Sequence, residues 1–169
     1  MSHSVTVTRT TTTTTTSAIL INTGYFKAVP GLLKLGQVIL GTIIIGLVAT
    51  TLSRYNNYYY SGSEELFFFV TACACLIATG CLLISCLLSI STASIISKTI
   101  FLLMLLVPLT LMYLIAATLV LVTVVARNYG HKIYEDEFST RIHAAILGLF
   151  NTILYLASTI LAFKSYRGG

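Results

Sequence analysis

Residues 99–126 read TIFLLMLLVPLTLMYLIAATLVLVTVVA, and Lys98 and Arg127 bound the run. The run contains no charged residue and exceeds the roughly 20 apolar residues that cross a hydrocarbon core of about 30 Å. A strand of a membrane barrel would be about 10 residues long and alternate in polarity, which this run does not. Because backbone polar groups in lipid must find partners within their own segment, the run is predicted to be a transmembrane helix. Pro108 is predicted to kink or locally loosen it.

Three further runs share this character, and they predict membrane spans at 35–53, 66–90 and 142–163. The serine-rich stretch 91–97 is predicted to be a turn between the second and third spans. Only 9% of the chain is charged, against about 25% in a soluble domain. The predicted fold class is therefore all-α, an integral membrane bundle of four transmembrane helices.

The two ends of the chain are polar tails, and four spans place them on one side of the membrane. Residues 1–24 are rich in threonine and predicted to be disordered, residues 25–164 form the membrane domain, and 165–169 are a short tail. Short loops rich in Lys and Arg favour the cytoplasm, so the side with more of these residues is predicted to be cytoplasmic. The tail side holds Arg9, Lys27, Lys34, Lys98, Lys164 and Arg167 without acids, whereas the other side holds Arg54, Arg127, Lys132, Arg141 and all five acids.

Catalytic and cofactor motifs are absent from the sequence, so the chain is predicted not to be an enzyme and to bind no cofactor. The His and acidic residues of 131–143 match no metal-binding spacing, and neither do the four cysteines, which are predicted to be small buried hydrophobes. The basic residues are scattered at membrane edges, which argues against a nucleic-acid partner. No charged residue lies inside a predicted span, which disfavours a channel or transporter. Gln37 and His143 are expected to bond a neighbouring helix or to lie at the wet interface.

Small residues at four-residue spacing mark candidate packing surfaces, because membrane helices associate where small side chains allow close approach. They could serve contacts within one chain or between chains, including copies of this chain, and the sequence leaves both open. The candidates are Thr42, Gly46 and Thr50 in the first span, Thr71, Cys75 and Thr79 in the second, and Ala144, Gly148 and Thr152 in the fourth.

The start of the first span, TGYFKAVPGLLKLGQVILG at residues 23–41, resembles the opening of MARVEL-domain proteins. It is most similar to the branch that holds the chemokine-like-factor MARVEL transmembrane proteins and plasmolipin. The similar features are the Leu-Lys-Leu-x-Gln sequence at Leu33–Gln37 and the aromatic start of the second span at Glu65–Phe69. Asn151 within the last span and Phe163–Lys164 at its end are also similar. The resemblance covers about residues 25–164.

The resemblance implies a non-enzymatic organiser of membranes, active in membrane apposition, vesicle trafficking, microdomains or cell junctions. Its implied partners are membrane lipids and other membrane proteins, at the plasma membrane or on endosomal vesicles. The alternative from another functional class is a small channel or transporter, or an auxiliary subunit of one.

Overall fold

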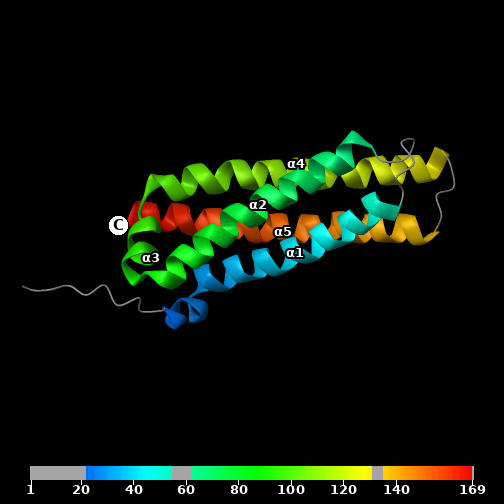
Figure 1. Cartoon of the computed structure of the whole chain (residues 1–169). Coiled ribbons are helices and arrows are strands. Elements are labelled where there is room, and N and C mark those ends of the chain that lie inside the picture. The colour runs from blue at the N-terminus through cyan, green and yellow to red at the C-terminus, as the bar shows by residue number, and fades with distance from the viewer. Residues whose placement is uncertain (1–21, 55–61, 131–134, 169) are drawn as a thin grey trace, which may run out of the picture.

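The computed structural model describes residues 22–54, 62–130 and 135–168. These residues form helices and short connections, without a strand (Figure 1). Four of the helices are long and apolar enough to cross a membrane, which confirms the all-α, four-span prediction. The elements are η1 (Thr23–Lys27), α1 (Val29–Arg54), α2 (Ser63–Leu88), α3 (Ile90–Ile96), α4 (Ile100–Gly130) and α5 (Glu135–Gly168).

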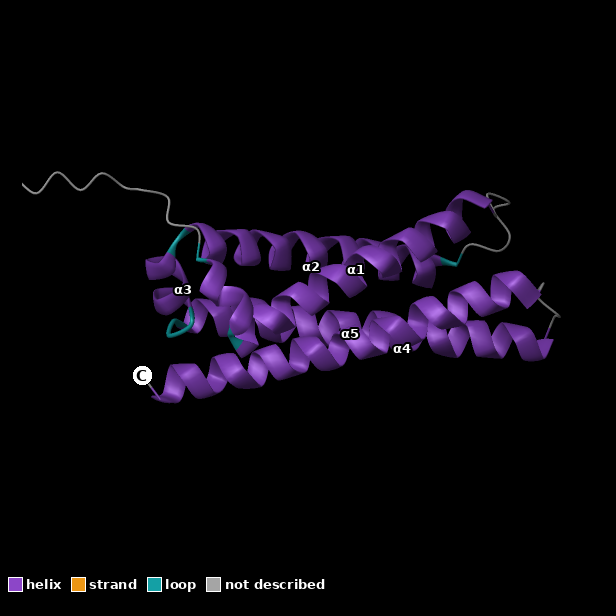
Figure 2. Ribbon diagram, turned by 90° about the horizontal axis from the view of Figure 1, so that it is seen from below, coloured by secondary structure: helices purple, strands orange, loops and turns teal. Residues whose placement is uncertain are grey.

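The four long helices run side by side as one bundle (Figures 1 and 2). Helix α1 packs against α2 and α5, and α4 packs against the same two helices, so α1 and α4 lie at opposite corners. The short elements η1 and α3 lie at one end of the bundle, where α1 begins and α5 ends (Figure 1). Both ends of the described chain therefore lie on the same side, as four spans require. We call this side the α3 end.

The structure corrects the predicted boundary between the second and third spans. Residues 91–97 were expected to form a turn, but Ile90–Ile96 is a short α-helix. The side chain of Ser89 accepts a hydrogen bond from the Thr92 amide at 3.2 Å, which satisfies a free N–H at the start of this helix. Serine-rich composition suggested a turn because serine often caps and terminates helices, and here one serine caps a new helix.

The long helices also extend beyond the uncharged runs. Helix α1 begins at Val29 and contains Lys34, whereas the prediction began at residue 35. Helix α5 begins at Glu135 and contains Arg141, whereas the prediction began at residue 142. A charged residue does not end a helix, because the backbone hydrogen bonds continue and the side chain can turn inward or reach toward water. The predicted tail 1–24 lies almost wholly outside the described residues.

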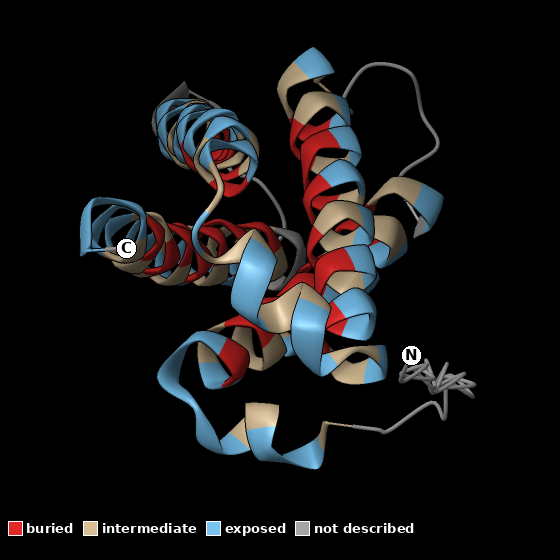
Figure 3. Cartoon of the chain, turned by 90° about the vertical axis from the view of Figure 1, so that its left-hand side faces the viewer, coloured by how far each residue is buried: buried red, intermediate tan, exposed pale blue. Residues whose placement is uncertain are grey.

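The interior and the perimeter of the bundle have different compositions. Buried residues lie along the inner side of the long helices (Figure 3). The largest fully buried side chains include Tyr113, Tyr155 and Phe68 together with the polar Gln37 and Asn151. The perimeter carries many exposed aliphatic and aromatic side chains. This arrangement suits a lipid environment, in which an apolar outer surface costs nothing and polar groups find partners inside.

Candidate functional site

Three aromatic rings fill the middle of the bundle. Phe68 of α2 meets Tyr113 of α4 edge to face, with ring centroids 5.9 Å apart. Tyr113 in turn stacks on Tyr155 of α5 at 5.6 Å, and all three side chains are fully buried. Gly148 makes room for them, because a Cβ there would lie 2.8 Å from the Phe68 ring. The rings thus join three of the four helices at mid-bundle.

Hydrogen bonds between helices surround these rings. The Tyr155 hydroxyl donates to the Cys75 carbonyl at 3.1 Å and lies 2.6 Å from the Thr79 hydroxyl. Since the single phenol proton goes to the carbonyl, Thr79 is the donor in the second bond. Toward the α3 end, the Gln37 amide donates to the Ser158 hydroxyl at 2.8 Å, which confirms that Gln37 bonds a neighbouring helix.

Two of the three predicted stripes face the interior. Thr71, Cys75 and Thr79 are buried on α2, and Ala144, Gly148 and Thr152 are buried on α5. Cys75 and Thr79 contribute to the bonds of Tyr155, and Gly148 accommodates Phe68. These stripes are therefore surfaces where the chain packs on itself, although the sequence did not indicate which partners they would have.

The third stripe faces outward. Thr42, Gly46 and Thr50 are exposed, and a Cβ added to Gly46 would meet nothing within 4 Å. The Thr42 and Thr50 hydroxyls bond carbonyls of their own helix at 2.8 Å. The stripe packs against none of the described helices, and its role between chains stays a prediction. The face of α1 that is buried carries Gln37, Gly41, Ile44 and Val48.

Two charged residues that the sequence places just outside the predicted spans are buried in the bundle. At the end away from α3, Arg141 Nη1 of α5 lies 2.8 Å from Glu65 Oε1 of α2, with side chains only 3% and 7% exposed. A second pair joins Arg127 to the neighbouring Glu64 at 3.6 Å, but its side chains are 34% and 32% exposed. The buried pair ties together α2 and α5, which are diagonal to one another in the bundle.

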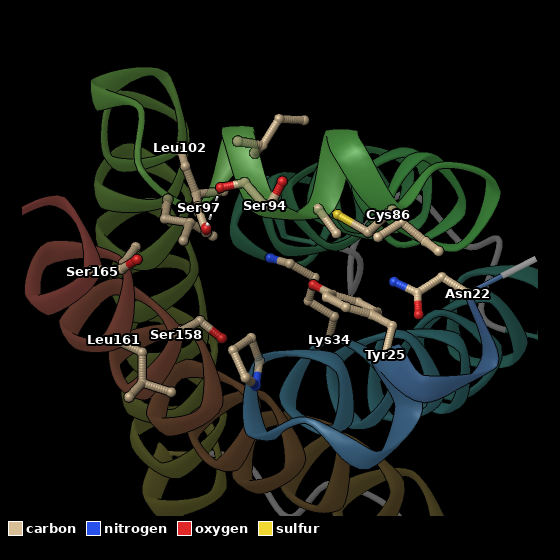
Figure 4. A pocket seen from close by; sticks show the side chains of 16 residues that line it. Asn22, Tyr25, Lys34, Cys86, Ser94, Ser97, Leu102, Ser158, Leu161 and Ser165 are labelled. Carbon is tan, nitrogen blue, oxygen red and sulfur yellow. Dashed lines mark hydrogen bonds between the residues drawn. The ribbon is translucent and has the colours of Figure 1, made fainter. Parts of the chain in front are cut away.

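A cavity of about 350 Å³ opens at the α3 end. Lys34, only 4% exposed, points into it beside Tyr25 and Cys86 (Figure 4). Burial, and then the nearby Cys86, raise the pKa of the Tyr25 phenol, which keeps it neutral. Every element of the described chain contributes to the walls. The wall residues are Asn22, Tyr25, Pro30, Lys34, Cys86, Ile90, Ala93, Ser94, Ile96, Ser97, Leu102, Leu106, Ser158, Leu161, Ala162 and Ser165.

Sequence reasoning placed Lys34 at a membrane edge and therefore missed this cavity. The sequence does place Lys34 three residues before Gln37, which puts both side chains on one helix face. The structure shows that this face is buried. Two other polar residues of the spans, His143 and Asn151, do not line this cavity. His143 is exposed and bonds the Ser139 carbonyl of its own helix, whereas the Asn151 carboxamide is buried without a hydrogen-bond partner among the described residues.

The prediction that the cysteines are small buried hydrophobes is not correct for every cysteine. Cys75 and Cys86 are buried, Cys73 is partly buried and Cys81 is exposed on the perimeter. In the described ranges, no group of three or more His, Cys, Asp or Glu side chains is placed to hold a metal ion.

A family model for the MARVEL domain, described as a membrane-associating domain, matches residues 25–161. The chain belongs to the MARVEL family. The matched range begins at Tyr25 and ends at Leu161, so this MARVEL domain includes the aromatic centre, the buried ion pair and most of the cavity wall. Comparison with curated proteins and with solved structures gave no significant match. Similarity to the chemokine-like-factor and plasmolipin branch stays a prediction.

Proposed function

We propose that this MARVEL protein is a non-enzymatic organiser of membranes, which acts through helix–helix contacts with partner membrane proteins and lipids. The processes in question are membrane apposition, vesicle trafficking, and the organisation of microdomains or junctions. The MARVEL family is one of non-enzymatic membrane proteins, and a membrane-associated role follows from membership. The main observation in support of an organiser is that the rings of Phe68, Tyr113 and Tyr155 fill the centre of the bundle.

The filled centre argues against the alternative of a channel or transporter. Phe68, Tyr113 and Tyr155 occupy the space between α2, α4 and α5 at mid-bundle. The hydroxyl of Tyr155 is already bonded within the bundle, so it does not line a water-filled path. The buried charges Lys34 and Arg141 lie near the starts of α1 and α5, and these two helices begin at opposite ends of the bundle (Figure 1). A pathway for ions would need this centre to open.

The perimeter supports contacts with lipids and other membrane proteins. It presents exposed apolar side chains around the bundle, and on α1 it presents the small residues Thr42, Gly46 and Thr50. Small residues let the backbone of a second helix approach closely, which is the main source of attraction between helices in lipid. We include association with further copies of this chain in the proposal.

The distribution of charge supports a cytoplasmic location for the α3 end. Lys27, Lys98, Lys164 and Arg167 are exposed there, and basic residues close to the spans favour the cytoplasmic side. We therefore place both termini in the cytoplasm and the protein in the plasma membrane or endosomal vesicles, as a multi-pass protein.

Reconstitution into sealed vesicles separates the organiser from the channel. The full chain is inserted into vesicles that carry a potassium gradient and a pH-sensitive dye, with protein-free vesicles as the baseline and a pore-forming peptide as the positive control. We expect potassium and proton fluxes equal to the baseline at all protein densities. A flux that rises in proportion to the amount of inserted protein would contradict the proposal and favour the channel.

A further inference from the structure

The cavity at the α3 end contains a charge that the chain does not neutralise. Lys34 is 4% exposed, and within the described residues it makes no hydrogen bond or ion pair. Burial of a cationic side chain without a partner in a membrane domain is costly, and such residues usually mark a functional site.

No acidic side chain of this protein is placed to serve as that partner. The five acids are at positions 64, 65 and 135–137, where α2 and α5 begin. Both helices begin at the end of the bundle away from α3 (Figure 1). Glu65 already lies against Arg141 there, and Glu64 against Arg127. No acidic side chain therefore lies at the α3 end, and we expect a ligand to supply the negative charge that faces Lys34.

The walls of the cavity indicate the chemistry of that ligand. Besides Lys34, the polar part of the walls consists of Asn22, Tyr25 and four serines (Ser94, Ser97, Ser158 and Ser165), and most other wall residues are apolar. An ammonium group surrounded by hydroxyls suits an anionic oxygen group such as phosphate. The apolar walls suit hydrocarbon, so a soluble anion would leave most of the cavity surface without a partner.

The charge at the α3 end points to a lipid as the source. Lys27, Lys98, Lys164 and Arg167 are exposed around this end, and clusters of basic residues beside membrane spans attract anionic lipids. A volume of about 350 Å³ is at the low end of the range for small-molecule sites. It is therefore suited to the headgroup region of a lipid whose acyl chains extend into the bilayer.

We propose that the cavity binds the phosphate headgroup of an anionic phospholipid, with Lys34 as the charged contact and the hydroxyls of Ser158 and Ser165 as donors. The hydroxyls of Ser94 and Ser97 already donate to the Ser91 and Ser94 carbonyls. This inference deepens the proposed function, because it rests on the lipid contacts of the organiser and names their chemical class. It assigns to one buried lysine a selectivity that the apolar perimeter of the bundle does not have.

The test measures binding of phosphatidic acid and of phosphatidylcholine to the purified full chain in a neutral detergent by native mass spectrometry. We expect the wild type to prefer phosphatidic acid, and Lys34→Gln to weaken that binding by at least about fivefold, the factor for one lysine beside anionic lipid. Lys34→Arg keeps the charge and should retain the preference. The comparison variant Lys98→Gln removes a lysine of the exposed basic cluster at the same end and should weaken binding less than Lys34→Gln does, because solvent and salt screen an exposed charge.

A second variant tests the cavity separately from the charge. Ala93 lines the wall on α3, so Ala93→Phe fills the space while leaving Lys34 in place, and it should weaken binding as Lys34→Gln does. Inorganic phosphate at the same concentration should not displace phosphatidic acid. If it displaces the lipid, or if Lys34→Gln binds phosphatidic acid as tightly as the wild type, the proposal is wrong.

The thermal unfolding temperature in the neutral detergent shows whether a variant that loses lipid binding is still folded. Lys34→Gln removes an unpaired buried charge, so without lipid it should unfold at the same temperature as the wild type or higher. Phosphatidic acid should then raise the unfolding temperature of the wild type and not of the variant. An equal rise in both would overturn the site. If the lipid site is wrong, the ion fluxes measured in vesicles stay at the baseline and the proposed organiser function stands. If the vesicles show ion flux, the organiser function is contradicted, and the lipid-binding measurement is unaffected.

Discussion

The pairs Glu65–Arg141 and Glu64–Arg127 form a natural comparison, since two adjacent carboxylates differ in burial. Arg141 Nη1 and Glu65 Oε1 are 2.8 Å apart with side chains 3% and 7% exposed. At an effective dielectric constant of about 20, the Coulomb attraction at that distance is about 6 kcal/mol. Most of this attraction offsets the loss of hydration of two charges, so the attraction is not the net stability.

Removal of one partner has a different cost, because the other charge then stays buried. Arg141→Met or Glu65→Leu alone should lower the free energy of unfolding by about 3–5 kcal/mol. The double variant should recover most of that loss, since no charge then remains in the site. Glu64→Gln breaks the half-exposed pair with Arg127, which is 3.6 Å long, and should cost about 0–1 kcal/mol.

The assay is reversible unfolding of the full chain in mixed micelles, with increasing sodium dodecyl sulfate and helix content as the signal. Each variant is compared with the wild type at the same lipid and salt concentration. Equal losses for Glu64→Gln and Glu65→Leu would refute the reasoning, because burial would then make no difference. A double variant that loses the sum of the two single losses would refute the coupling of Glu65 to Arg141.

Three further results are expected. Gly148→Leu should lower the free energy of unfolding by about 1–3 kcal/mol, because a Cβ there would lie 2.8 Å from Phe68 and 3.2 Å from Ala117; Gly80→Leu, which meets nothing within 4 Å, should be near neutral in the same titration. Tyr155→Phe and Thr79→Val should show a coupling energy of about 0.6–1.7 kcal/mol in a double-mutant cycle, and additive losses would mean that their 2.6 Å contact contributes nothing. Protease-sensitive tags at either terminus should stay uncut on intact cells, and cleavage from outside would reverse the proposed topology.

Hydropathy alone was sufficient for the four spans, because lipid forces each apolar run to satisfy its own backbone. Helix ends were less predictable. The prediction began the first and fourth spans immediately after Lys34 and Arg141, but these two residues belong to the helices and their side chains are buried in the bundle. Whether a charged side chain at a helix end faces lipid, water or the interior depends on helices distant in the sequence.

The outward stripe on α1 illustrates the same difficulty. Thr42, Gly46 and Thr50 and the buried series Gln37, Gly41, Ile44 and Val48 are both regular, and both contain small or polar residues. Spacing identifies the faces of a helix but does not say which one meets a partner. That choice depends on α2 and α5, which pack against α1. Likewise, the cavity around Lys34 needs walls from α3, α4 and α5, and no local pattern near Lys34 indicates them.

The central claim is that the perimeter of a closed bundle makes contacts with other membrane proteins, and Gly46 tests it most directly. Gly46→Leu adds a bulky side chain to the outward stripe, where a Cβ meets nothing within 4 Å, and Gly80→Leu is the matched control on α2. The measurement is fluorescence energy transfer in live cells between full-length chains that carry a donor and full-length chains that carry an acceptor, because further copies of the chain are among the proposed membrane partners. A sodium dodecyl sulfate titration checks that stability is unchanged. We predict that Gly46→Leu loses energy transfer at wild-type stability while Gly80→Leu keeps it. Equal transfer in wild type and Gly46→Leu would contradict the account, as would a loss that follows a drop in stability.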